Sequence, residues 1–195
     1  MEKKYLINQL WPLVVLLTFF SFILGILYPG LVMFINQLAF PNLANGSLII
    51  EDRVLGSELI GQPFSSEKFF WSRPSATTPM YNPLLSSGSN LSPANPQLLQ
   101  NIKERMALLN KHSPNNTMPV PIDLVTASAS GLDPHISIAS AYYQIPRIAK
   151  ARSIEESVLY ELVNSMVENR QFGFLGEPRV NVVKLNLTLH KADRY

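Results

Sequence analysis

The sequence contains no cysteine, so disulfides, thiolate-bound zinc and a cysteine nucleophile are all excluded. Charged residues are scarce, at 15% of the chain, whereas hydrophobic residues reach 47%. The net charge of +2 is spread without a dense basic run, which argues against nucleic acid as a partner. The phosphate-binding pattern G-x-x-x-x-G-K-[ST] is also absent, and no G-x-G-x-x-G opens a helix, so we expect no nucleotide site of a recognised kind.

A long uncharged run near the N-terminus accounts for the apolar bias. Residues 10–35 carry no charged side chain and exceed the roughly 20 residues that a helix needs to cross about 30 Å of hydrocarbon. They predict one transmembrane helix, in which Tyr28-Pro29-Gly30 marks a kink or the outer end of the regular helix. A cleaved signal peptide is the alternative, but its apolar region is shorter and ends in a small-x-small site.

The charges around this helix predict its direction. Lys3 and Lys4 precede it, and no Lys or Arg follows until Arg53, so the positive-inside rule places residues 1–9 in the cytoplasm. Residues 36–195 then form an extracytoplasmic domain. The helix contains no ionisable side chain and offers no ion relay of its own, so one such helix cannot form a transport pathway alone.

The outer domain is predicted to be α+β. Short strands are expected within residues 48–62, and prolines in residues 61–96 forbid a continuous helix, which predicts a long surface loop. Asn95-Pro96 and Asp133-Pro134 each resemble a helix start, and Ser153 begins a capping box before a third helix. Residues 180–190 alternate imperfectly and predict a terminal strand.

One polar segment could carry chemistry. Ser128 or Ser130 could act as a nucleophile with His135 as base and Asp133 as orienting carboxylate, but the nucleophile-elbow pattern G-x-S-x-G is missing. Asp133 is therefore predicted to be a structural helix cap. Asp133 and His135 lack further ligands at metal-binding spacing, so neither a metal nor a catalytic site is expected.

Several motifs in one order carry a family resemblance. They are Tyr28-Pro29 at the end of the apolar run, GQPF at 61–64, FFWSRPS at 69–75, SSGSNLSPANP at 86–96, DLVTASASGLDPHIS at 123–137 and GEPRVNVVKLN at 176–186. Together they resemble the C subunit of the bacterial potassium-transporting Kdp P-type ATPase over nearly the whole chain.

The resemblance implies a non-catalytic accessory subunit in the bacterial inner membrane. Its partners would be a channel-like A subunit, an ATP-hydrolysing B subunit and a small F subunit. The family's C subunit is proposed to stabilise the assembly and, as a catalytic chaperone, to raise the ATP affinity of the B subunit. ATP and potassium would then be ligands of the complex, because an extracytoplasmic domain cannot touch ATP bound on the cytoplasmic side.

Two other readings remain open from the sequence: a membrane-anchored extracytoplasmic serine hydrolase, and an independent binding module. If the chain is a subunit, its loop is the expected docking segment. Phe69, Phe70, Trp71 and Arg73 are of the residue types that dominate interface energetics, and the neighbouring prolines limit the entropy lost on ordering. For any one of these aromatics, filling the domain core is the competing interpretation.

Overall fold

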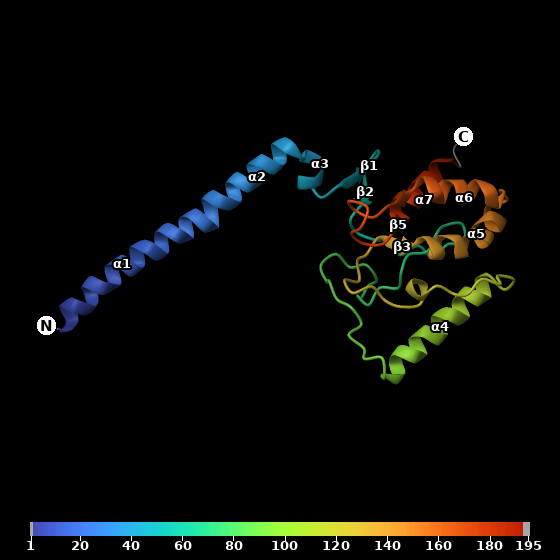
Figure 1. Cartoon of the computed structure of the whole chain (residues 1–195), viewed down its shortest axis with the longest axis horizontal. Helices are drawn as coiled ribbons and strands as arrows, with labels where there is room; N and C mark the ends of the chain where they lie inside the picture. Colours follow the sequence, from blue (N-terminus) through green and yellow to red (C-terminus); the bar gives the residue numbers. More distant parts are fainter. Residues whose placement is uncertain (1, 193–195) are drawn as a thin grey trace. The chain divides into compact units, whose positions relative to one another are not determined.

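The structure is a computed structural model that describes residues 2–192. The chain divides into two compact units, Met1–Ile50 and Glu51–Tyr195. The first is mainly helical and the second mixes helices with a small sheet, so the chain is α+β as predicted (Figure 1).

The first unit consists of consecutive helical segments. α1 (Glu2–Phe22), the π-helical turn η1 (Ile23–Leu27) and α2 (Tyr28–Ala39) follow one another without a break, and α3 (Pro41–Ala44) and β1 (Leu48–Ile50) complete the unit. The part from Leu10 to Ala39 is long and apolar enough to cross a membrane. Its 30 residues would measure about 45 Å, more than the hydrocarbon thickness of about 30 Å.

The helix does not end at Tyr28-Pro29-Gly30, so the expectation that these residues mark the outer end of the regular helix is wrong. It continues to Ala39, and the irregularity is the π turn immediately before Pro29, where the Tyr28 N–H donates to the Ile23 carbonyl. Proline removes an N–H from the helical ladder, and a π bulge is one way in which a helix absorbs that defect without ending.

The second unit is built on a three-stranded antiparallel sheet of order β3–β5–β4. β3 (His135–Ser137) and β4 (Val167–Glu168) both pair with β5 (Arg179–Asn181), which places Ile136 and Val167 beside Val180. The helices α5 (Ile138–Arg152), α6 (Glu156–Ser165) and α7 (Val182–Ala192) supply the other walls of the main core.

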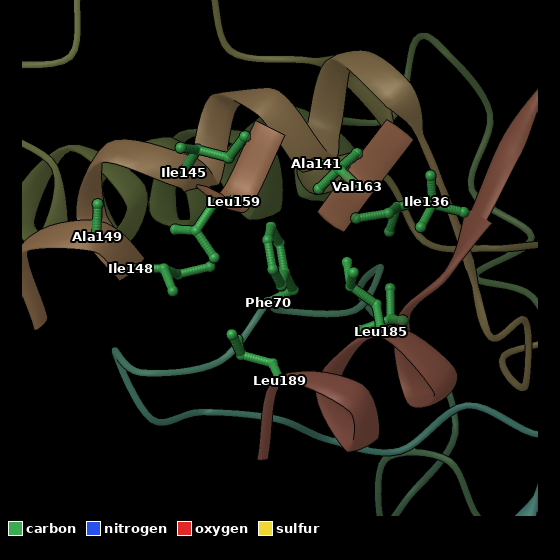
Figure 2. Packing of buried hydrophobic residues seen from close by; sticks show 12 residues of the cluster. Phe70, Ile136, Ala141, Ile145, Ile148, Ala149, Leu159, Val163, Leu185 and Leu189 are labelled. Carbon is green, nitrogen blue, oxygen red and sulfur yellow. The ribbon is translucent and has the colours of Figure 1, made fainter. Parts of the chain in front are cut away.

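Phe70 lies at the centre of that core (Figure 2). Its ring is surrounded by side chains from the sheet and the three helices, namely Ile136, Ala141, Ile145, Ile148, Leu159, Val163, Leu185 and Leu189. The loop segment that carries Phe70 is therefore an integral layer of the domain.

A second, smaller cluster of buried residues lies beside the main core. β2 (Val54–Ser57) is followed by a loop without helix or strand through residue 95, as the prolines predicted. α4 (Pro96–His112) buries Leu109 against Leu124 of the 3₁₀ turn η2 (Ile122–Leu124) and against Tyr143 of α5. The start of α4 is confirmed, because the Asn95 side chain accepts a hydrogen bond from the Gln97 N–H.

Two predicted helix starts are wrong. After Asp133-Pro134 the chain enters β3, and α5 begins only at Ile138 with Ser137 as its N-cap, accepting a hydrogen bond from the Ser140 N–H. Asp133 therefore caps no helix, because strand pairing holds the residues after it in an extended conformation. Ser153 closes α5 in a left-handed conformation (φ 58°), and α6 starts at Glu156, so the expected capping box does not form.

The predicted C-terminal strand is also largely wrong. Only residues 179–181 pair in the sheet, and α7 follows at once. The Asn181 side-chain oxygen accepts hydrogen bonds from the Val183 and Lys184 N–H groups, which is the geometry of an N-cap. The same apolar residues that suggested alternation also fit a helical face, since Val182, Leu185 and Leu189 are buried at spacings of three and four.

Candidate partner-contact site

Residues 69–73, the aromatic segment, were the predicted docking site, and side chains from distant helices fix their backbone. The Phe70 N–H donates to the Asn186 side-chain oxygen at 2.8 Å, and the Asn186 amide nitrogen donates to the Phe70 carbonyl at 2.8 Å. Gln144 does the same for Trp71, at 2.7 Å and 3.2 Å. The side-chain amides of Asn186 and Gln144 thus make the backbone hydrogen bonds that a neighbouring strand would otherwise make, because this segment belongs to no sheet.

Phe70 is fully buried, so the docking prediction is wrong for this residue. Its side chain is committed to the core (Figure 2) and presents no surface to a partner. The alternative interpretation, in which an aromatic of this segment fills the core, holds for Phe70.

Phe69 and Trp71 are half-buried and contact arginines of their own chain. The Arg147 guanidinium lies 4.4 Å from the Trp71 ring centroid, and that of Arg152 lies 5.1 Å from the Phe69 ring centroid. Arg147 also donates to the carbonyls of Glu67 and Phe69 at 2.6 Å and 3.0 Å. Burial lowers the pKa of Arg147 to about 10, yet the side chain remains protonated at neutral pH. These arginines bind the loop to α5.

Arg73 starts a row of charged and ionisable side chains across the sheet surface. Arg73 Nη1 lies 3.1 Å from Asp133 Oδ2, and His135 Nδ1 lies 3.2 Å from Asp133 Oδ1. The other His135 ring nitrogen lies 3.4 Å from Glu168 Oε2, which also pairs with Arg179 at 3.2 Å. The row joins the loop to all three strands.

The environment of Asp133 favours its charged form. Burial by itself raises the pKa of the Asp133 carboxyl, but hydrogen bonds from the His135 side chain and backbone, together with the charges of His135 and Arg73, hold that pKa below its usual value. The predicted role of Asp133 as a helix cap is wrong, and its carboxylate instead pairs with Arg73 and His135 and accepts a hydrogen bond from the His135 N–H at 3.0 Å.

The structure does not assemble the serine-hydrolase arrangement. Ser128 Oγ accepts from the Gly131 N–H at 2.9 Å, and Ser130 Oγ accepts from the Leu132 N–H at 3.1 Å, so both hydroxyls shape the turn before β3. Both ring nitrogens of His135 face carboxylates. His135 therefore has no ring nitrogen directed at a serine hydroxyl, as a general base would need in order to remove the hydroxyl proton.

Two clefts flank Arg73. An apolar cleft of about 510 Å³ lies between the aromatic segment and α4, and its lining includes Trp71, Met80, Tyr81 and Leu108. A more polar cleft of about 590 Å³ is lined by residues that include Asp123 and His135. Burial raises the pKa of Tyr81 to about 12, and its hydroxyl donates to the Arg73 carbonyl at 2.5 Å.

The most exposed aromatic side chains among residues 51–192 lie elsewhere. Phe172 and Phe174, between β4 and β5, are 87% and 70% exposed. Neither residue is among the docking candidates that the sequence predicted. The overlooked signal was the sequence FGFL itself, in which apolar side chains occupy a turn that normally favours polar residues.

These features define a small α+β protein in which one helix within residues 2–192 is long and apolar enough to span a membrane. A family model described as K+-transporting ATPase, c chain (KdpC) matches residues 10–191. The chain belongs to this family, and the resemblance based on its motifs is confirmed.

Relatives named potassium-transporting ATPase KdpC subunit cover nearly the whole chain. The protein from Methylococcus capsulatus is 56% identical over 186 residues, covering 94% of this chain and 98% of the relative. The protein from Burkholderia ambifaria is 52% identical over 184 residues, covering 93% and 95%. The protein from Methylibium petroleiphilum is 54% identical over 167 residues, covering 85% and 87%.

Proposed function

We propose that this chain is a non-catalytic accessory subunit of an ATP-driven, high-affinity potassium uptake complex. The observation that carries the proposal is family membership across residues 10–191, a span that includes both the apolar helix and the whole sheet. Its partners in the complex are the channel-like A subunit, the ATP-hydrolysing B subunit and the small F subunit.

The chain is anchored in the bacterial inner membrane by its N-terminal helix, with residues 1–9 in the cytoplasm and residues 36–195 outside. The charge asymmetry supports this orientation, because Lys3 and Lys4 lie before the helix and Arg53 is the first basic residue after it. A reporter that is active only in the cytoplasm should stay silent when fused after Tyr195. Strong reporter activity would show that the orientation is the reverse of the one proposed.

The chain acts by stabilising the assembly and by raising the ATP affinity of the B subunit from a distance. In the proposed orientation the second unit and the bound ATP lie on opposite sides of the membrane, so the effect passes through the helix or through coupled conformations of the complex. ATP and potassium are ligands of the complex, and this chain contributes no direct ligand to either.

The test is purification of the tagged chain from potassium-starved cells, with partners identified by mass. The proposal requires the other pump subunits to be recovered with it, and removal of the chain to raise the ATP concentration needed for half-maximal ATPase activity. Recovery of the tagged chain alone would overturn the proposal.

A second measurement addresses catalysis. Since His135 is held between two carboxylates and Ser130 supports a turn, His135→Ala and Ser130→Ala should leave potassium-dependent ATPase activity measurable in the assembled complex. Complete loss of turnover in a correctly assembled His135→Ala complex would instead assign this histidine a role in the reaction.

A further inference from the structure

Residues 171–176 form a hairpin that projects apolar side chains into solvent. Gln171 and Leu175 exchange two backbone hydrogen bonds of 2.9 Å, and the Phe174 N–H donates to the Gln171 carbonyl at 3.2 Å. An ion pair of 2.6 Å between Arg170 and Glu177 closes the base. The hairpin therefore has an ordered backbone, so little conformational entropy would remain to be lost on binding.

The side chains at the tip make no contribution to the core. Phe172, Phe174 and Leu175 are 87%, 70% and 47% exposed, and none of them belongs to either core cluster of residues 2–192. Each buried phenylalanine removes about 150–250 Å² of surface from water, so leaving two of them exposed forgoes a large hydrophobic contribution.

Phe172 is also held in an unfavourable backbone conformation. Its φ is +52°, in the left-handed region that bulky residues rarely occupy, whereas Gly173 and Gly176 adopt their positive φ without steric cost. Asparagine or glycine would suit the position of Phe172 better if the turn were its only purpose. Backbone strain of this kind is often retained at functional positions, and the strained Phe172 is also 87% exposed.

The charges next to the tip favour a protein partner over a lipid surface. Residues 171–176 carry no charge, and the nearest arginines, Arg170 and Arg179, are already paired with Glu177 and Glu168. Binding to anionic headgroups usually relies on unpaired Lys or Arg beside the apolar residues. A neutral aromatic tip on a rigid hairpin instead fits an apolar concavity in a folded protein.

We propose that the 171–176 hairpin inserts Phe172 and Phe174 into an apolar pocket on another subunit of the potassium pump. The inference rests on the proposed function and assigns to it a docking element separate from the aromatic segment. Two adjacent aromatic side chains filling a desolvated pocket are the usual form of an interface hot spot, and the paired charges at the base would form its polar rim.

The test compares two variants of the full chain, co-produced with the other subunits. The double variant Phe172→Ala/Phe174→Ala should lower recovery of the assembled complex by about tenfold or more. Leu99→Ala is the matched control, because Leu99 is 55% exposed on α4 of the same unit and lies outside the predicted docking loop, and it should leave recovery unchanged. Unchanged far-ultraviolet circular dichroism would show that both variants fold.

Recovery of the complex at the original level in the double variant would overturn the hairpin proposal while leaving the proposed function intact. Failure of the unaltered chain to recover any partner would overturn the proposed function itself. The two failures are therefore distinguishable.

A photoreactive benzoylphenylalanine at position 172 identifies the occupant in the assembled complex. The expected product has the mass of this chain plus another pump subunit. A lipid adduct would assign the hairpin to the membrane surface, and a product with twice the mass of this chain would assign it to a second copy. Either result, or the absence of any product, would overturn the proposal.

Discussion

Asn186 of α7 holds the backbone of Phe70 through both atoms of its side-chain amide, at 2.8 Å each, although 116 residues separate the two positions. Asn186 is 2% exposed and Phe70 is fully buried. The amide replaces the hydrogen bonds that a neighbouring strand would supply, and so allows an irregular segment to pass through the core without unpaired backbone groups.

Asn186→Leu should therefore destabilise the fold strongly. The substitution leaves the Phe70 N–H and carbonyl buried without partners, at a cost of about 1–3 kcal/mol for each group. Denaturant titration of the full-length chain in detergent measures the loss. Asn110→Leu, on the exposed side of α4, is the control and should change the free energy of unfolding by less than about 0.5 kcal/mol. Equal effects in both variants would contradict the role assigned to Asn186.

The same loop depends on Arg147, which contacts the Glu67 and Phe69 carbonyls and the Trp71 ring. Arg147→Met keeps the aliphatic volume but removes every donor, so the free energy of unfolding should fall by at least about 2 kcal/mol.

Arg179→Met is the matched control for Arg147→Met. The Arg179 side chain is 47% exposed and its ion pair with Glu168 lies at the surface, where such pairs contribute about 0–1 kcal/mol. A loss in Arg147→Met no greater than in this control would mean that the buried guanidinium does not hold the loop.

The lowered pKa of Asp133 predicts loss of stability in acid. A carboxyl whose pKa is lower in the folded state binds fewer protons when folded, so it stabilises the fold above its unfolded pKa of about 3.9. That contribution disappears as the pH falls through the lower, folded pKa. In Asp133→Asn the free energy of unfolding should consequently vary less with pH over this range.

The control for Asp133→Asn is Glu161→Gln, at an exposed position on α6, which should keep the acid dependence of the unaltered chain. Denaturant titrations from about pH 5 down to about pH 2.5 supply the measurement. An Asp133→Asn curve that parallels that of the unaltered chain would show that another carboxyl causes the acid sensitivity.

Local signals in the sequence predicted some helices and strands correctly and others wrongly. Asn95-Pro96 predicted the start of α4 correctly because the cap and the first turn need no distant partner. Asp133-Pro134 carries the same signal, but pairing of β3 with β5 keeps the following residues extended. Residues 182–189 fit both a strand and a helical pattern, and only the Asn181 cap and packing against the core decide between them.

The candidate site was harder to predict than the elements. The sequence identifies residues 69–73 as a group suited to contact, but the burial of Phe70 depends on α5, α6 and α7, which lie far along the chain. The charge row from Arg73 to Arg179 likewise depends on strand pairing that brings Glu168 beside His135. Residue type alone does not determine which of these side chains remain at the surface, because that depends on packing between elements far apart in the sequence.

Arg73, like the half-buried Phe69 and Trp71, is a member of the aromatic segment for which a docking role stays a prediction. Its side chain is 25% exposed and lines both clefts, and one guanidinium nitrogen pairs with Asp133. Arg73→Ala should leave the second unit folded but lower its retention in the complex by about fivefold or more, the effect of losing ~1 kcal/mol of binding free energy. Recovery of partner subunits at increasing salt measures that retention.

Asp133→Asn is the decisive control for Arg73→Ala, because it weakens the same internal ion pair while keeping the guanidinium in place. If Arg73 contacts a partner, Asp133→Asn should retain the complex and Arg73→Ala should not. An equal loss in both variants would mean that Arg73 acts only by supporting the loop through Asp133. Unchanged recovery and unchanged potassium-dependent ATPase activity in Arg73→Ala would remove this residue from the interface and leave the 171–176 hairpin as the docking element of the second unit.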